Sequence, residues 1–167
     1  MKKILITDDV IDIPEDKQIP WDHIVIHHSF TKDGALLDDF TAIKNYHVNV
    51  NGWQNIGYHF VIEFDKGQLH VKQGRRLNTQ GAHTKEGHMN KRGIGVCVVK
   101  NGDSEAYTNA EYNALLSLIE TLRLEYPAIV MENVKPHSFF SPYKTCPGHK
   151  FDWSAFMVKL ERKEQFA

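Results

Sequence analysis

The side chains in this sequence best suited to chemistry are two histidines and a cysteine: His27, His137 and Cys146. His27 follows a β-branched run, His137 follows Val-Lys-Pro, and Cys146 lies nine positions later in a Pro-Gly turn. Two imidazoles and one thiolate suit zinc, and three protein ligands leave the fourth tetrahedral position open, as a catalytic site requires. An ion with one thiolate ligand keeps a net positive charge and can lower the pKa of bound water toward about 7.

A plainer interpretation stands beside this one, because sequence separation does not show that residue 27 meets residue 137. His27 and His28 could form a solvent-exposed pair at a strand end, and Cys146 could be a half-buried thiol beside a turn. The other cysteine, Cys97, lies in an apolar run and is predicted to be an inert core thiol. Two cysteines in such different surroundings exclude a disulfide scaffold.

Length and composition predict one compact domain over residues 1–167, since 41% of the residues are apolar. Twenty basic and twenty-one acidic side chains give a formal charge of -1, so no global field draws the protein to nucleic acid or to an anionic surface. No stretch approaches the roughly 20 apolar residues that span a bilayer. We therefore expect a monomer that neither binds nucleic acid nor inserts into membranes.

Three segments of the N-terminal half are predicted to place the candidate ligands. The run from His23 to Ile26 is typical of a buried strand that delivers polar side chains at its C-terminal end, where chemistry is common. A short helix is expected from Asp38 to His47. Tyr58–Phe64 and Gln68–Lys72 then form a hairpin signature, with Gly67 where a positive φ is wanted.

The C-terminal half predicts a covering layer and a central strand. Ile94–Val99 is apolar on both faces, which indicates a strand in the middle of a sheet. A capping box at Thr108 opens a helix whose apolar residues repeat at helical spacing until Pro127. The other expected elements are a short strand at the N-terminus, a glycine-punctuated loop over Gly74–Gly93, a strand over Ile129–Met131, a loop over Val134–Lys150 and a helix from about Asp152. Together they predict an α/β domain with a central mixed β-sheet flanked by helices.

A series of short motifs runs through residues 21 to 156. They are Ile24-Val25-Ile26-His27-His28-Ser29, Tyr46-His47, Gly52-Trp53, Ile56-Gly57-Tyr58-His59-Phe60, Gly74-Arg75, Gly81-Ala82-His83, Gly93-Ile94-Gly95-Val96 and Lys144-Thr145-Cys146-Pro147-Gly148. In this order and spacing the chain resembles the type 2 N-acetylmuramoyl-L-alanine amidases, which include phage endolysins and share a fold with peptidoglycan recognition proteins.

The resemblance implies a zinc hydrolase that acts on bacterial peptidoglycan. It would cut the amide between the lactyl carbonyl of N-acetylmuramic acid and the amino group of L-alanine. His27, His137 and Cys146 would ligate Zn2+, with Tyr58 and Lys144 facing the metal. Tyr58 could hydrogen-bond the reacting water or the departing amine, and Lys144 would place a cation where the oxyanion develops. The plainer interpretations are a core tyrosine and a surface lysine.

The glycine-punctuated loop is expected to line one wall of a substrate groove, with Arg75 and His83 as contacts, because its glycines would let the backbone approach a ligand. One departure from the family pattern lies between His137 and Cys146. The sequence there is Ser-Phe-Phe-Ser-Pro-Tyr, where many relatives have an Arg-Asp or similar polar pair. This departure bears on the orientation of His137 and on the groove wall.

Two other functions remain open. A recognition module that binds cell wall without cutting it would replace the ligand cysteine, so Cys146 argues against it. A second, regulatory role, in which the amidase also binds an RNA polymerase, is neither favoured nor opposed by the sequence. The N-terminal apolar run meets Asp8 and Asp9 before it reaches signal length. We therefore expect a phage or prophage endolysin made in the cytoplasm of the host cell without a signal peptide, acting on the wall after release.

Overall fold

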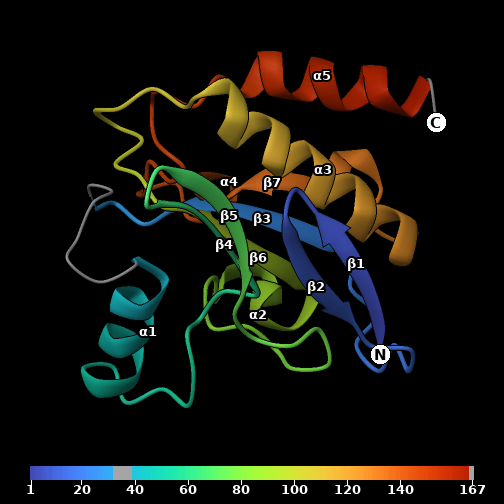
Figure 1. Cartoon of the computed structure of the whole chain (residues 1–167), viewed down its shortest axis with the longest axis horizontal. Helices are drawn as coiled ribbons and strands as arrows, with labels where there is room; N and C mark the ends of the chain where they lie inside the picture. The colour runs from blue at the N-terminus through green and yellow to red at the C-terminus, as the bar shows by residue number, and fades with distance from the viewer. Residues whose placement is uncertain (32–38, 166–167) are drawn as a thin grey trace.

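A five-stranded sheet forms the centre of the computed structural model, which describes residues 1–31 and 39–165 (Figure 1). Its strand order is β5-β4-β6-β3-β7, with β6 in the middle. β3 runs parallel to β6 and β7, β4 runs parallel to β6, and β4 and β5 form an antiparallel hairpin. The strands are β3 (His23–His28), β4 (Phe60–Asp65), β5 (Gln68–Gln73), β6 (Gly93–Val98) and β7 (Val134–Pro136). The predicted mixed sheet is confirmed.

The central strand β6 is buried along its whole length, as its apolar sequence predicts. Its neighbour β3 pairs with it in parallel, so His27 lies opposite Cys97 and His28 opposite Val98. Cys97 is fully buried, in agreement with a core thiol. Parallel strands end at the same edge of the sheet, and here that edge carries the two adjacent histidines of β3.

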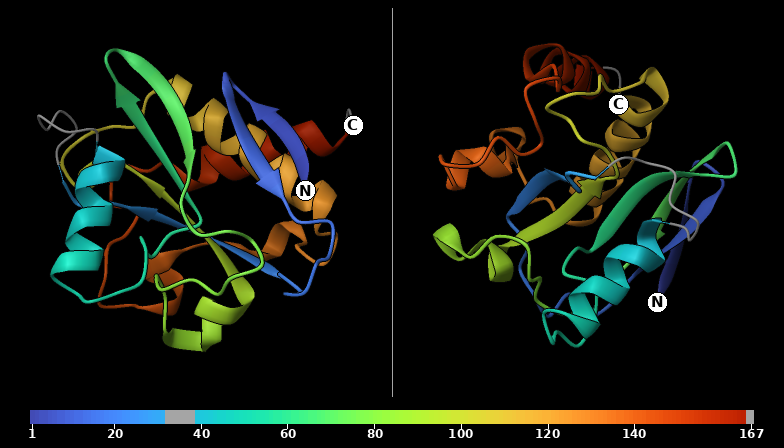
Figure 2. Two further views of the ribbon diagram at one scale, coloured as in Figure 1. Left: turned by 60° about the horizontal axis from the view of Figure 1, so that its bottom comes forward. Right: turned by 90° about the vertical axis from the view of Figure 1, so that its left-hand side faces the viewer.

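Helices cover both faces of the sheet (Figures 1 and 2). α3 (Asn109–Glu125) and α5 (Trp153–Gln165) lie on one side, and α1 (Asp39–Asn49) lies on the other. α3 begins with the predicted capping box, in which Thr108 accepts from the amide of Glu111 and the Glu111 carboxylate accepts from the amide of Thr108. The expected start of α1 at Asp38 lies outside the described residues.

The predicted strand over Ile129–Met131 is wrong. Ile129 is buried, but Val130 is exposed, and a 3-10 turn, η2 (Met131–Asn133), follows. The apolar side chain at 129 therefore reports packing in the core and not pairing in the sheet. β7 instead begins at Val134, at the sheet edge, where a strand tolerates a proline such as Pro136.

The two segments expected to be plain loops contain short elements of their own. The segment from 134 to 150 opens with β7 and then forms α4 (His137–Phe140). The segment from 74 to 93 contains a 3-10 turn, η1 (Glu86–His88), and α2 (Met89–Arg92). No described helix is long and apolar enough to cross a membrane.

The predicted first strand is confirmed as β1 (Lys2–Ile6), but it pairs with β2 (Asp9–Ile13), which was not predicted. This hairpin docks on β5 through polar contacts: Asp9 accepts a hydrogen bond from the amide of Val71, and the side chain of Gln73 bonds both backbone groups of Asp12. In β2 the buried Ile11 and Ile13 alternate with Asp12, and only Asp9 breaks the pattern, because it shares their face and binds the amide of Val71 in β5.

Candidate metal centre and active site

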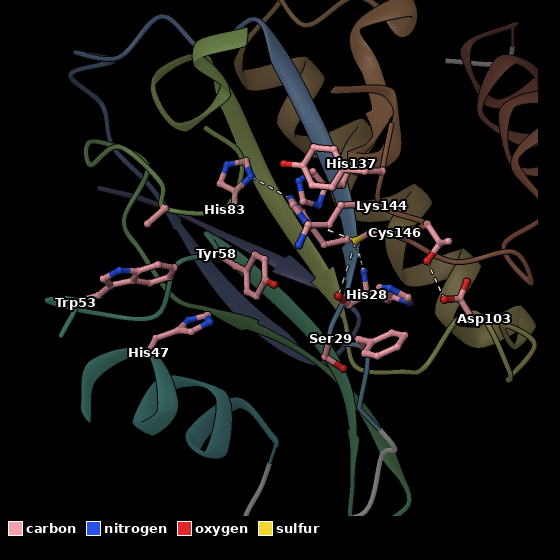
Figure 3. A pocket seen from close by; sticks show the side chains of 15 residues that line it. His28, Ser29, His47, Trp53, Tyr58, His83, Asp103, His137, Lys144 and Cys146 are labelled. Atoms are coloured by element: carbon pink, nitrogen blue, oxygen red, sulfur yellow. Dashed lines mark hydrogen bonds between the residues drawn. The ribbon is translucent and has the colours of Figure 1, made fainter. Parts of the chain in front are cut away.

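The structure brings His27, His137 and Cys146 together at the carboxyl end of β3 (Figure 3). One ligand atom from each lies within 4.8 Å of the others. His27 Nδ1 is 3.7 Å from Cys146 Sγ. In a tetrahedral site with Zn–N near 2.1 Å and Zn–S near 2.3 Å, two such ligand atoms stand about 3.6 Å apart. The spacing of His27 and Cys146 therefore suits zinc, and all three residues are of the ligand types that zinc prefers.

Strand register explains how two residues so far apart in sequence become neighbours. β3 and β7 run parallel, and Ile26 stands opposite Pro136. The residues that follow these two positions, His27 and His137, therefore lie side by side at the sheet edge, with their ring centroids 4.4 Å apart. A parallel pair thus delivers both imidazoles.

Cys146 reaches them from the turn before α5. Its sulfur accepts a hydrogen bond of 3.2 Å from the amide of His28, and its carbonyl accepts one of 2.9 Å from the amide of Ser138. The turn packs against the loop that contains Gly102, where a Cβ would lie 2.0 Å from the carbonyl oxygen of Pro147. Position 148 requires glycine because its φ is +102°. The thiol position is therefore set by backbone contacts on both sides.

Burial sets the protonation states of the three candidate ligands. It lowers the pKa of His27 well below the ordinary value and, with the nearby charge of Lys144, lowers the pKa of His137 to about 4. Burial raises the pKa of the Cys146 thiol to about 12, although the hydrogen bond from the amide of His28 and the positive charge of Lys144 each act to lower it. At neutral pH both imidazoles are neutral and able to bind a metal, whereas the thiol must lose a proton on metal binding.

A cavity of about 500 Å³ opens beside these residues. Tyr58 is half-buried in its wall, with its ring centroid 5.2 Å from that of His27, and burial raises the pKa of its hydroxyl well above 10. That hydroxyl stays protonated and can donate a hydrogen bond. The residues that line the cavity are His27, His28, Ser29, Phe30, His47, Trp53, Tyr58, Ala82, His83, Asp103, His137, Tyr143, Lys144, Thr145 and Cys146.

The two expected substrate contacts differ in position. His83 lines the cavity, and its Nδ1 is 3.0 Å from His27 Nε2. Arg75 is not among the lining residues: its Nε donates to the carbonyl of Ile56 and its Nη1 to the carbonyl of Gln80, both at 2.8 Å. These bonds tie the loop to the segment that precedes Tyr58.

The glycines of this loop make room for protein neighbours. A Cβ on Gly74 would meet the side chain of Ile56 and the carbonyl of Tyr58 at 2.5 Å, and a Cβ on Gly81 would meet the ring of His83 at 2.5 Å. Gly74 and Gly81 therefore have a packing role, whereas contact of this loop with a substrate stays a prediction.

Several cavity residues were not assigned from the sequence. His47 belongs to a quoted motif, and its Nδ1 accepts a hydrogen bond of 3.0 Å from the amide of Gly57. Asp103 carried no sequence signal, and it accepts a hydrogen bond of 2.7 Å from the hydroxyl of Thr145. Tyr143 lies in the aromatic segment that departs from the family pattern. It is 72% exposed, and its hydroxyl donates a hydrogen bond to the carboxylate of Glu86.

Comparisons with known proteins identify the family of this chain. The model of the N-acetylmuramoyl-L-alanine amidase family matches residues 17–149. The chain is 35% identical to an endolysin of Klebsiella phage KP32 over 144 residues, which are 83% of this chain and 86% of that protein. It is 34% identical over 128 residues to an endolysin of Enterobacteria phage K11, covering 73% of this chain and 77% of that protein. The structure resembles the N-acetylmuramoyl-L-alanine amidase LysC from Clostridium intestinale URNW with a TM-score of 0.73 and 27% identity, covering 89% and 90% of the two chains. The chain belongs to the N-acetylmuramoyl-L-alanine amidase family.

Proposed function

We propose that this protein is a zinc-dependent endolysin of a phage or prophage that hydrolyses the amide between N-acetylmuramic acid and L-alanine in bacterial peptidoglycan. The observation that carries the proposal is the cluster of His27, His137 and Cys146, whose ligand atoms lie within 4.8 Å of one another in the wall of an open cavity. A purely wall-binding module has no need of such a cluster. We also propose that the protein acts as a monomer on the wall after release from the cytoplasm.

His27, His137 and Cys146 would hold the zinc ion, with His27 binding through Nδ1, the nitrogen that faces the sulfur. A zinc ion bound there would supply Lewis-acid activation of water and polarisation of the substrate carbonyl. The amide of His28, which donates to the sulfur, would hold the thiolate in place and stabilise its charge. The neutral state of both imidazoles at pH 7 favours binding without a competing proton.

Tyr58 and Lys144 would act on the reacting atoms from two parts of the cavity wall. Tyr58 keeps its proton because of burial, so its hydroxyl can donate a hydrogen bond to the substrate or supply a proton to the departing amine. Lys144 is exposed on the turn that carries Cys146, and its ammonium would stabilise the negative charge that develops on the carbonyl oxygen. The scissile amide would thus lie between a donor and a cation.

The glycan and stem peptide would occupy the rest of the cavity. Arg75 would support its wall through the two backbone carbonyls that it binds, and direct contact with substrate is the alternative role expected from the sequence. The exposed rings of Phe30 and Tyr143 lie on the rim, where a sugar ring can stack.

Dye release from purified, dye-labelled cell walls tests the hydrolysis directly. The wild type should release dye, lose that activity with a zinc chelator and regain it when zinc is added back. Mass spectrometry should find one zinc per wild-type chain and far less in Cys146→Ser. Release that is unchanged by chelator, or equal zinc content in both proteins, would refute the proposal.

A further inference from the structure

We infer that His83 is a positioning residue that holds His27 in the orientation needed for metal binding, and not a substrate contact. The inference rests on the proposed function for the presence of a metal. It replaces the role expected from the sequence, in which His83 would touch the peptidoglycan. The hydrogen bond between the two histidines is the dashed line that leaves His83 in Figure 3.

A chain of hydrogen bonds assigns the protons on both rings. His83 Nε2 lies 3.0 Å from the carbonyl oxygen of Gly93, which can only accept, so this nitrogen carries the proton. His83 Nδ1 is then an acceptor, and it lies 3.0 Å from His27 Nε2. If His27 Nε2 carried no proton either, two lone pairs would face each other at 3.0 Å. His27 therefore donates from Nε2 and keeps the lone pair of Nδ1 directed toward Cys146.

The ring of His83 is held by the backbone around it. A Cβ on Gly95 would lie 2.6 Å from His83 Cγ and Cδ2, and a Cβ on Gly81 would lie 2.5 Å from His83 Cδ2, so both glycines make room for this ring. The side chain of Asn90 accepts hydrogen bonds from the amides of His83 and Thr84 at 2.7 and 2.8 Å. Because these contacts fix the ring of His83, it can orient a neighbouring side chain but cannot readily move to adapt to a substrate.

This arrangement extends a common feature of metal sites by one residue. A histidine that binds metal usually donates its other N–H to a carboxylate, carbonyl or water, which fixes the tautomer and the ring orientation. Here a second histidine stands between His27 and the carbonyl of Gly93. Thr84 Oγ1 lies beside the same bond, 3.1 Å from His83 Nδ1 and 3.4 Å from His27 Nε2. Loss of such partners typically weakens metal binding about 10- to 100-fold.

The test measures zinc affinity by competition with a chromophoric chelator, together with urea unfolding of each metal-free protein. His83→Phe removes the acceptor while filling the space of the ring, and should weaken zinc binding about 10- to 100-fold. His83→Gln offers an amide oxygen to His27 and should recover part of that loss. Gly95→Ala pushes the ring without altering it and should act in the same direction as His83→Phe.

The matched control is His70→Phe. It removes a half-buried histidine of the distant strand β5 that bonds Asp9 of β2, and it should leave zinc affinity unchanged. Zinc affinity of His83→Phe equal to the wild type would overturn the inference. So would a raised KM for wall hydrolysis with unchanged zinc affinity, since this would make His83 a substrate contact. Equal zinc loss in His70→Phe would make the effect one of general stability. A wild type that binds no zinc would instead defeat the proposed function itself, and the inference with it.

Discussion

Gly102→Ala should disable the proposed metal site, although Gly102 is not one of the proposed ligands. A Cβ at position 102 would lie 2.0 Å from the carbonyl oxygen of Pro147, 2.9 Å from the Tyr107 hydroxyl and 3.1 Å from His28 Nδ1. All three neighbours belong to the frame that holds the turn of Cys146. The Tyr107 hydroxyl donates to the Pro147 carbonyl at 2.7 Å, and His28 Nδ1 accepts from the Gly102 amide at 3.0 Å. The added methyl group therefore cannot be accommodated by a side chain that simply rotates away.

The size of the effect follows from the overlap. Real Cβ contacts are not shorter than about 3 Å, so the loop and the Cys146 turn must separate by about 1 Å, and overpacking of this kind costs about 1–3 kcal/mol of stability. A displacement of about 1 Å in a catalytic group lowers turnover about 100-fold. Zinc affinity should fall as well, because the sulfur moves away from the two imidazoles.

Three measurements on Gly102→Ala test this reasoning: urea unfolding of the metal-free protein, zinc competition with a chelator, and dye release from labelled walls. Gly67→Ala is the control. A Cβ at Gly67 has no atom within 4 Å, but its φ of +77° makes alanine unfavourable by about 1 kcal/mol, in a turn between β4 and β5. It should lose stability and keep its zinc affinity. Wild-type zinc affinity and dye release in Gly102→Ala would show that the turn yields freely and that the reasoning is wrong.

Four further outcomes are expected. Tyr58→Phe and Lys144→Ala should each keep the fold and one zinc by mass spectrometry while losing about 100-fold in dye release; near-normal release in either variant would remove that residue from the mechanism. Zinc binding near pH 7 should release about one proton, because burial raises the pKa of the Cys146 thiol to about 12 in the metal-free protein. Calorimetry in buffers of different ionisation enthalpy measures the number of protons released, and a value of zero would contradict the prediction. Burial lowers the pKa of His59 from 6.5 to about 4, so the unfolded state takes up a proton at this histidine before the folded state does as pH falls. The contribution of His59 to the stability of the metal-free protein should be complete above pH 6.5 and decrease toward pH 4 by up to about 1.4 kcal/mol per pH unit. A free energy of urea unfolding that does not change over this pH range would contradict the prediction. Arg75→Ala should lower stability by about 1 kcal/mol through its two lost backbone bonds, whereas weaker hydrolysis at unchanged stability would make Arg75 a substrate contact.

Local signals in the sequence predicted most of the elements. Gly67 has the positive φ that its place in the hairpin demands, and Thr108 opens its helix with the capping box that its spacing with Glu111 predicts. Both features depend on residues within a few positions of one another. The strand prediction over Ile129–Met131 was wrong because Ile129 is apolar in order to pack in the core, and a single sequence does not distinguish core burial from strand pairing.

The types of the candidate ligands were readable from the sequence, since two imidazoles and a thiol suit zinc wherever they meet. Their meeting was decided by the register of β3 against β7, which sets Ile26 opposite Pro136 and thus His27 beside His137. The sequence suggested this convergence only through resemblance to a family.

The atoms that act within the site were decided by tertiary structure alone. His27 turns Nδ1 toward Cys146 and Nε2 toward His83, which stands 56 positions away in sequence and in turn bonds the carbonyl of Gly93. Arg75 lies behind the wall because two backbone carbonyls receive its guanidinium. Turns and caps are governed by neighbours along the chain, whereas hydrogen bonds between distant segments exist only once the sheet has brought those segments together.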